Sequence, residues 1–484
     1  MIRFYLSLLL AVLPSLTSAD TTNDLYQQHC ASCHGATRLG GMGPALLPEN
    51  LSRLRKNNAI TVIREGRAAT QMTGFGSVLN DDQIAALAEY IYQPPDSKPE
   101  WTLQNVRDSH VMHYEVATLP DQPSFKADLQ NLFIVVELGD HHATLLDGDS
   151  FTPIHRFSTR FALHGGPKYS PDGRFVYFAS RDGWISKFDI YNLKTVAEIR
   201  AGINTRNMAV SFDGRYAMVA NYLPHNLVLL DTENLTPIKE FPVEGRVSAV
   251  YTAPPRNSFV AALKDSKTIL EIPYQAPFSV RTIPTTTYLD DFFFDQSYRH
   301  LIGASRNGDS GQVIELDTGK AIATIPLAGM PHLGSGISWQ YQGKTVMATP
   351  HLKEGKVSII DMDNWQVIKQ IDTLGPGFFM RSHDNSPYAW VDVFFGPNKE
   401  AVHLIDKRTL EIAHTLKPEP GKTAAHVEFT KDGSHALLSL WEQDGAVIVY
   451  DAKTLKEVKR LPMRKPSGKY NVYNKTHYAA GTSH

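Results

Sequence analysis

The sequence has very little cysteine, no large excess of charge and no long hydrophobic run beyond its first residues. Its 484 residues include two cysteines, Cys30 and Cys33, which lie too close together to build a disulfide framework. Lysine and arginine total 48 against 50 aspartate and glutamate residues, so the formal net charge is −2. Because no long basic run occurs, we expect neither nucleic acid nor an anionic membrane surface as the main partner. The length exceeds that of one ordinary domain.

The N-terminus has the composition of an export signal. Arg3 precedes an apolar run over residues 4–16, and the small residues at 17–19 suit cleavage before Asp20. The run is shorter than the roughly 20 residues that a spanning helix needs. We therefore predict a signal peptide at 1–19 and no membrane span after cleavage. An uncleaved membrane anchor is the alternative.

Residues 30–34, Cys-Ala-Ser-Cys-His, have the spacing of a c-type heme attachment site. Thiols three positions apart on one helical turn can both reach the vinyl groups, which predicts covalent heme c on Cys30 and Cys33 with His34 as an iron ligand. Zinc would need two further ligands, and the chain has no other cysteine. Since the heme would be attached after export, the expected compartment is a bacterial periplasm.

Two methionines are candidates for the sixth iron ligand. Met42 lies in a glycine-rich stretch eight residues after His34, which we expect to pack on the proximal side. Met72 comes 38 residues after His34, before a predicted helix that begins at Asn80 or Asp81. This order resembles small class I cytochromes c and favours Met72, whose thioether would suit electron transfer. The alternative is that Met72 packs in the core of the domain and does not ligate the iron. Residues 20–95 are thus predicted to form a small all-α cytochrome c domain.

After a proline-containing linker at 93–99, short apolar strands alternate with turns. Asp-Gly pairs at 172, 213 and 432 precede strands, and an aspartate recurs near strand ends at 147, 189, 231, 317, 361, 406 and 451. Successive aspartates of this series are about 43 residues apart on average, when the longer spacing from 231 to 317 is counted as two repeats. A repeat of this length is typical of four-stranded propeller blades. We predict an all-β eight-bladed β-propeller over residues 96–484, with ligands at its central channel.

A c-type cytochrome ahead of such a propeller resembles the cytochrome cd1 family, whose propeller holds noncovalent heme d1. Short strings around residues 161–164, 180–183, 202–206, 330–332, 381–383 and 468–474 resemble family segments in the same order. The resemblance implies that His164 ligates the heme d1 iron and that Arg181 and Arg206 face its carboxylates. It also implies that His332 and His383 approach the open face of the iron.

The family contains two chemistries. In one, paired distal histidines donate protons while heme d1 reduces nitrite to nitric oxide. In the other, an enzyme of heme d1 biosynthesis oxidises a propionate of bound dihydro-heme d1 to an acrylate, and electrons leave through heme c. The short chain, the absence of an N-terminal arm and the unexpected His426 favour the second chemistry.

This interpretation implies an oxidoreductase with a base near the propionate, for which His332, His426 and Tyr470 are the candidates, with His383 nearby. The implied partners are a tetrapyrrole substrate, a periplasmic electron acceptor and, as a recipient of heme d1, a nitrite reductase. Nitrite reduction and non-catalytic carriage of heme d1 are the alternatives.

Overall fold

The computed structural model describes residues 21–67 and 70–477, so the predicted signal peptide at 1–19 lies outside the described residues. The chain divides into two compact units, Met1–Arg67 with Met72–Pro94 and Ala68–Gln71 with Pro95–His484. No helix within the described ranges combines the length and the apolar character needed to cross a bilayer.

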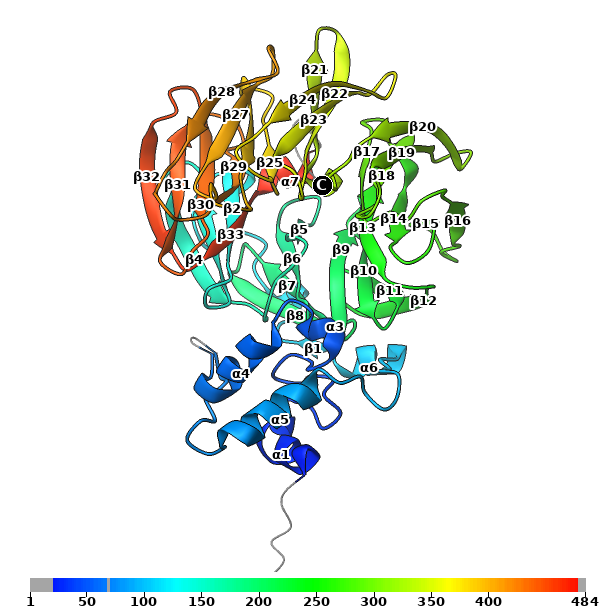
Figure 1. Ribbon diagram of the computed structural model, residues 1–484, viewed down its shortest axis with the longest axis vertical. Helices are drawn as coiled ribbons and strands as arrows, with labels where there is room; N and C mark the ends of the chain where they lie inside the picture. The colour runs from blue at the N-terminus through cyan, green and yellow to red at the C-terminus, as the bar shows by residue number, and fades with distance from the viewer. Residues whose placement is uncertain (1–20, 68–69, 478–484) are drawn as a thin grey trace, which may run out of the picture. The chain divides into compact units, whose positions relative to one another are not determined.

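The first unit is helical (Figure 1). Its helices are α1 (Thr22–His29), α2 (Ala31–His34), α3 (Pro48–Leu51), α4 (Lys56–Glu65) and α5 (Asp81–Ile91). Capping boxes begin α1 at Thr21 and α5 at Asn80 because each side chain satisfies an otherwise unpaired helical N–H. The apolar faces of α1, α4 and α5 enclose one core, against which Cys30 and Phe75 pack. The predicted all-α cytochrome c fold is confirmed.

The second unit is a ring of eight antiparallel blades (Figure 1), which confirms the predicted eight-bladed propeller. Blade 1 contains β33 (Pro466–Asn471), β2 (Leu132–Glu137), β3 (His142–Asp147) and β4 (Thr152–Ser158). Blade 2 contains β5 (Lys168–Tyr169), β6 (Phe175–Ala179), β7 (Trp184–Asp189) and β8 (Lys194–Arg200), with β1 (Val111–Met112) added at its outer edge. Blade 3 contains β9 (Asn204–Val210), β10 (Tyr216–Leu223), β11 (Asn226–Asp231) and β12 (Pro237–Pro242). Blade 4 contains β13 (Val247–Ala253), β14 (Ser258–Leu263), β15 (Thr268–Pro273) and β16 (Arg281–Pro284).

Blade 5 contains β17 (Asp291–Phe294), β18 (His300–Ala304), β19 (Ser310–Glu315) and β20 (Lys320–Pro326). Blade 6 contains β21 (Ile337–Tyr341), β22 (Lys344–Pro350), β23 (Lys356–Asp361) and β24 (Gln366–Asp372). Blade 7 contains β25 (Met380–Arg381), β26 (Tyr388–Asp392), β27 (Val402–Asp406) and β28 (Glu411–Leu416). Blade 8 contains β29 (Ala424–Phe429), β30 (His435–Leu440), β31 (Gly445–Asp451) and β32 (Glu457–Met463). Short helices α6 (Leu103–Asp108) and α7 (Val472–Thr476) flank the ring in sequence.

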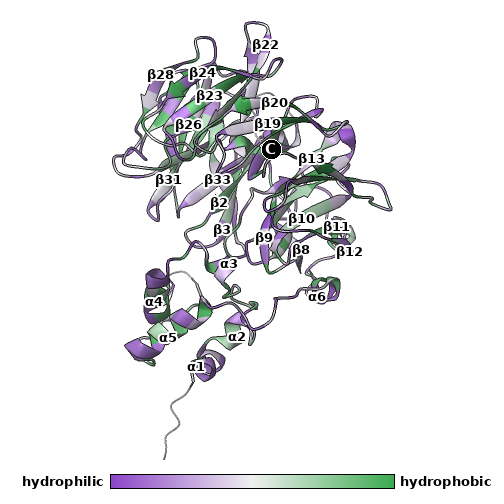
Figure 2. Cartoon of the chain, turned by 45° about the vertical axis from the view of Figure 1, so that its right-hand side comes forward, coloured by the Kyte–Doolittle hydropathy of each residue, from purple (hydrophilic) through white to green (hydrophobic). Residues whose placement is uncertain are grey.

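The repeated sequence signals are turns of the blades. The glycines of the three Asp-Gly pairs have φ of 73–75° in the turn after the innermost strand, a conformation that favours glycine. Six of the seven recurring aspartates end third strands, where a carboxylate accepts an N–H of the next turn, as Asp361 does from Asp363; Asp317 follows β19 instead. Hydrophobic residues are accordingly concentrated in the strands (Figure 2), whose faces pack between blades.

The ring is closed by pairing its last strand with its first. β33 pairs antiparallel with β2, with Ile134 opposite Tyr470, so blade 1 is built from both ends of the propeller sequence. At the interface between blades 7 and 8, Arg381 of β25 and Glu428 of β29 form a buried ion pair at 2.6 Å. Asn474 of α7 donates to the same carboxylate at 3.0 Å. Glu428 therefore joins blades 7 and 8 to the C-terminal helix.

Removing Glu428 should destabilise the propeller strongly. Glu428→Ala leaves Arg381 buried without its counterion, and we expect it to lower the free energy of unfolding by about 3–5 kcal/mol. Glu457→Ala is the control, since its ion pair with Arg460 is partly exposed and should contribute only about 0–1 kcal/mol. Urea unfolding followed by circular dichroism measures both, and equal losses would contradict a special role for Glu428.

Candidate functional site

The Cys-x-x-Cys-His motif occupies one short turn of helix in the first unit. Cys30 and Cys33 are free, half-buried thiols at the start of α2 and within it. His34 ends α2, is buried, and bonds through Nδ1 to the carbonyl of Pro44 at 2.7 Å. This contact leaves Nε2 as the nitrogen that can ligate a metal. The three side chains fit a covalent heme whose iron His34 would hold.

The two methionine candidates differ in their surroundings. A Cβ on Gly43 would approach the His34 ring to 2.8 Å, so the stretch around residues 40–44 packs closely on the proximal histidine, as expected. Met42 in this stretch is 66% exposed, whereas Met72 is half-buried. The backbone of Met72 is anchored, since its carbonyl accepts the N–H of Arg67 at 2.9 Å. These positions favour Met72 as the sixth ligand, which stays a prediction.

In the propeller, most of the predicted site residues come from the innermost strands or the loops that enter them; Arg181, between β6 and β7, and His383, after β25, do not. His164 precedes β5 in blade 2 and His332 precedes β21 in blade 6. Because these blades are four apart in a ring of eight, the two histidines lie on opposite sides of its axis. A flat ligand at the axis could therefore meet one histidine on each face.

His164 is oriented by Arg206. Its Nδ1 bonds to the Arg206 carbonyl at 2.6 Å, which assigns the proton to Nδ1 and the lone pair to Nε2. The Arg206 guanidinium lies 3.4 Å from both ring nitrogens and donates to the carbonyl of Ser248. Arg181 lies between β6 and β7, half-buried, and its backbone bonds to Ala162 and Thr205. The predicted arginines thus flank the predicted iron ligand.

His426 and Tyr470 lie side by side on β29 and β33, with ring centroids 5.2 Å apart. Burial, together with the nearby Lys469 charge, lowers the pKa of His426 well below its usual range, so the imidazole is neutral. Burial raises the pKa of Tyr470, so its hydroxyl keeps its proton at neutral pH. The structure therefore places two of the three candidate bases side by side, with His426 as a proton acceptor and Tyr470 as a proton donor; their role at the propionate stays a prediction.

His332 faces an aromatic wall. Its Nδ1 bonds to the Phe378 carbonyl, and its ring centroid lies 4.3 Å from that of Phe378. The Asp291 carboxylate is 3.9 Å from Nε2. Phe379, next in sequence, lies 4.8 Å from His426 by ring centroids. The two neighbouring phenylalanines therefore connect His332 with His426, an arrangement that sequence reasoning missed.

The structure does not bring His383 together with His332. His383 follows β25 in the turn to β26, whereas His332 precedes its innermost strand, so the two lie at opposite ends of their blades. Nε2 of His383 bonds to the Lys431 carbonyl at 3.2 Å, and Nδ1 accepts the N–H of Asn385 at 3.1 Å. The resemblance of the short segment 381–383 to a family segment did not indicate at which end of the innermost strand His383 lies. The expected distal pair is corrected to His332 beside Phe378.

Several charged residues on or near the innermost strands were also missed. Lys168, Arg381 and Lys475 influence one another electrostatically, and Lys469 is influenced by the buried carboxylates of Glu428 and Asp392. Burial lowers the pKa of Lys168 to about 8 and that of Lys469 to about 7. Lys168 and Lys475 keep partial exposure although they lie deep in the ring. This excess of cations fits a ligand with several carboxylates.

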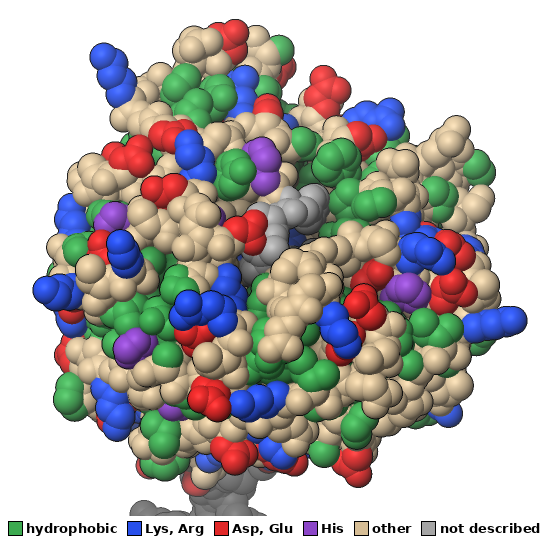
Figure 3. Space-filling model, turned by 90° about the horizontal axis from the view of Figure 1, so that it is seen from above, with side chains coloured by type: hydrophobic (Ala, Val, Ile, Leu, Met, Phe, Trp, Pro, Cys, Tyr) green, Lys and Arg blue, Asp and Glu red, His purple; other side chains and the backbone are tan. Residues whose placement is uncertain are grey.

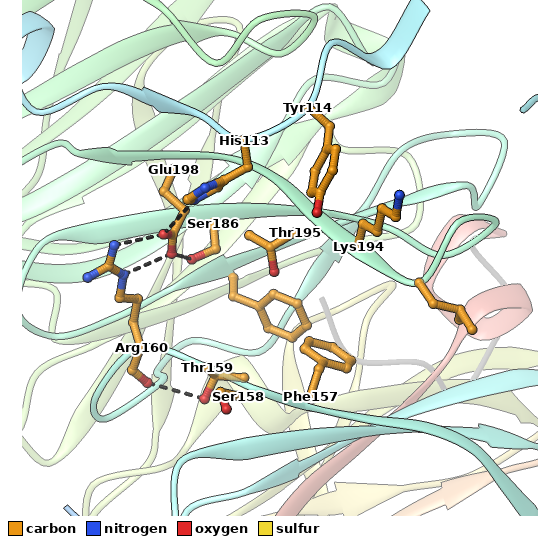
Figure 4. A pocket seen from close by; sticks show the side chains of 12 residues that line it. His113, Tyr114, Phe157, Ser158, Thr159, Arg160, Ser186, Lys194, Thr195 and Glu198 are labelled. Atoms are coloured by element: carbon orange, nitrogen blue, oxygen red, sulfur yellow. Dashed lines mark hydrogen bonds and ion pairs between the residues drawn. The ribbon is translucent and has the colours of Figure 1, made fainter. Parts of the chain in front are cut away.

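An open groove elsewhere on the propeller is a weaker candidate. It has a volume of about 680 Å³, lies between β4 and the outer strands of blade 2, and contains none of the predicted residues (Figure 4). The one carboxylate among its described lining residues, that of Glu198, is already paired, since Arg160 binds it through two nitrogens and His113 contacts it. On the face seen in Figure 3, basic and acidic side chains are interspersed, so the described residues of this face show no patch of one charge that would indicate a second site. The central channel, where the predicted residues gather, is therefore the candidate site.

Comparisons with known proteins support the assignment of a cytochrome c domain to the first unit and a heme d1 propeller to the second. The family model "Cytochrome D1 heme domain" matches residues 127–475, and "Cytochrome C oxidase, cbb3-type, subunit III" matches residues 17–91. A dihydro-heme d1 dehydrogenase of Pseudomonas aeruginosa is 59% identical over 95% of both chains. A nitrite reductase of Stutzerimonas stutzeri is 27% identical over 96% of this chain and 94% of that one.

A solved structure, dihydro-heme d1 dehydrogenase NirN in complex with DHE, superposes with a TM-score of 0.93 and 58% identity. The match covers 94% of this chain and 100% of that one. The high identity extends over nearly the full length of both chains, and the propeller model covers most of this sequence. The chain belongs to the cytochrome d1 heme domain family, in the form that carries a c-type cytochrome ahead of the propeller.

Proposed function

We propose that this chain is a periplasmic dihydro-heme d1 dehydrogenase, an oxidoreductase of heme d1 biosynthesis. It oxidises one propionate of bound dihydro-heme d1 to the acrylate of heme d1. The observation that carries the proposal is the neutral, buried His426 beside protonated Tyr470 in a cationic channel. His383 does not lie beside His332, which disfavours the chemistry expected of that histidine pair in nitrite reduction.

The reaction converts the –CH2–CH2– unit of the propionate to –CH=CH– and releases two protons and two electrons. His426 is the base that takes a proton, and Tyr470 orients the reacting side chain by donating its hydroxyl hydrogen. His164 would hold the tetrapyrrole iron, with His332 across the channel. Arg181, Arg206 and Lys168 would bind carboxylates. Bound heme c supplies the electron exit, one electron at a time.

The proposed partners follow from this chemistry. A periplasmic electron acceptor must reoxidise heme c after each electron arrives, because the reaction releases two electrons and heme c accepts one at a time. The product is a cofactor rather than a waste molecule, so a nitrite reductase is the proposed recipient of heme d1. A purely carrying protein would not need the Cys30–Cys33–His34 heme site.

Direct conversion tests the function. Wild-type protein incubated with dihydro-heme d1 and an oxidised one-electron acceptor should yield a pigment that has lost two hydrogens, measured by mass spectrometry after extraction. His426→Ala should slow conversion by roughly 100- to 10,000-fold while pigment binding stays nearly intact, since a general base acts in the transition state. His414→Ala, at an exposed histidine, is the matched control. Rapid nitric oxide formation from nitrite without acrylate would contradict the proposal.

The heme c assignment has its own test. Met72→Ala should abolish the absorption band of thioether-ligated ferric heme while the covalent heme stays attached through Cys30 and Cys33. Met42→Ala should leave the spectrum unchanged, because that side chain is 66% exposed on the loop packed against His34. Optical spectra of both variants decide the question. A Met72→Ala protein with the wild-type band would remove Met72 from the iron.

A further inference from the structure

Asp392 is a buried carboxylate that lies between the two candidate histidines. It ends β26 and is 1% exposed. Its Oδ1 accepts the backbone N–H groups of Phe378 at 2.7 Å and Phe379 at 3.0 Å. Its Oδ2 accepts the backbone N–H of His426 at 3.3 Å. One side chain thus holds the backbone of two segments that meet at the candidate site.

The contact between Asp392 and the N–H of Phe379 connects Asp392 to His332 through a single peptide unit. The carbonyl of the 378–379 peptide bonds to His332 Nδ1, and the N–H of the same peptide donates to Asp392. Carboxylate, peptide and imidazole are therefore connected in series, and each hydrogen bond polarises the next. The arrangement fixes the proton of His332 on Nδ1 and directs the lone pair of Nε2 away from the peptide.

The second contact holds His426 in an unusual backbone conformation. His426 has φ of 51°, in the left-handed region that non-glycine residues seldom adopt. Asp392 accepts its N–H, and Lys469 donates to its carbonyl through Nζ. Lys469 also donates to Ser439 at 2.7 Å, so the clamp is itself anchored. Asp392 and Lys469 thus hold the His426 backbone from both sides, and the His426 ring centroid lies 5.2 Å from that of Tyr470.

We propose that Asp392 is a positioning residue that aligns His332 and His426 together, through the 378–379 peptide and the His426 N–H. The inference rests on the proposed function only for its kinetic effect, because the hydrogen bonds exist in the protein without substrate. Burial raises the pKa of the Asp392 carboxyl to about 6, opposed by the three N–H groups and the Lys469 charge. The group is therefore ionised at neutral pH and accepts all three bonds.

Asp392→Asn is the direct test. An amide has one accepting oxygen, so its NH2 group must face either the Phe378 and Phe379 donors or the His426 donor. We expect kcat for dihydro-heme d1 oxidation to fall about 10- to 100-fold, with KM little changed, because small misplacements of a base reduce rate more than binding. In a His426→Ala background the same change should cost much less. Asp392→Glu, which keeps the charge, should restore part of the lost rate and provides a second folded variant.

A readout that does not depend on turnover is the tautomer of His332. Nitrogen NMR of 15N-histidine-labelled protein without tetrapyrrole should show His332, assigned by its loss in His332→Gln, protonated at Nδ1 in the wild type. In Asp392→Asn it should shift toward a tautomer mixture. This measurement tests Asp392 even if the wild type does not convert dihydro-heme d1, which separates failure of this inference from failure of the function.

Asp189→Asn is the matched control. Asp189 is 0% exposed at the end of β7, where it binds Arg174 and the turn that follows. Its loss should lower stability while leaving kcat and the His332 signal unchanged. The inference would be overturned by wild-type kcat and an unchanged His332 tautomer in Asp392→Asn. An equal kcat loss in Asp189→Asn would overturn it too, because the effect would then be general destabilisation.

Discussion

The buried charges around the propeller axis are the constraint on which the candidate site depends. Lys168, Arg381, Lys469 and Lys475 outnumber the carboxylates of Glu428 and Asp392 that accompany them. Enclosing cations costs free energy unless counterions or hydrogen bonds compensate. Glu428 offsets part of the cost by pairing with Arg381 and holding α7. We infer that a ligand with several carboxylates offsets the rest, which links the stability of the ring to its function.

The same charges also organise the chemistry. Lys469 donates to the carbonyl of His426 and contributes to the depressed pKa that keeps this imidazole neutral. Because Lys469 and Tyr470 are neighbours on β33, closure of the ring by its last strand delivers both to His426. The candidate base, its proton donor and its electrostatic environment therefore form only when blade 1 is complete.

Local signals predicted the fold well, and the site in part. The heme motif is contiguous in sequence, and the aspartates and Asp-Gly pairs mark turns whose conformation depends on neighbouring residues alone. His164, Arg206 and Tyr470 were predicted by resemblance and His426 as a departure from the reductase pattern, and the structure brings His426 and Tyr470 together. Lys168 and Asp392 were missed because an ordinary charged residue becomes distinctive only once its strand is known to be buried. The predicted position of His383 beside His332 was wrong, because the sequence did not show where β25 begins and ends, and His383 follows this strand.

Binding of a polycarboxylate tetrapyrrole in the cationic channel is tested most directly by proton uptake. Isothermal titration calorimetry with dihydro-heme d1 at about pH 8, near the depressed pKa of Lys168, in buffers of different ionisation enthalpy gives the number of protons exchanged. Carboxylates placed beside the half-buried Lys168 raise the pKa of its amine, so net proton uptake is expected. Binding with no proton exchange, or with net release, would contradict it.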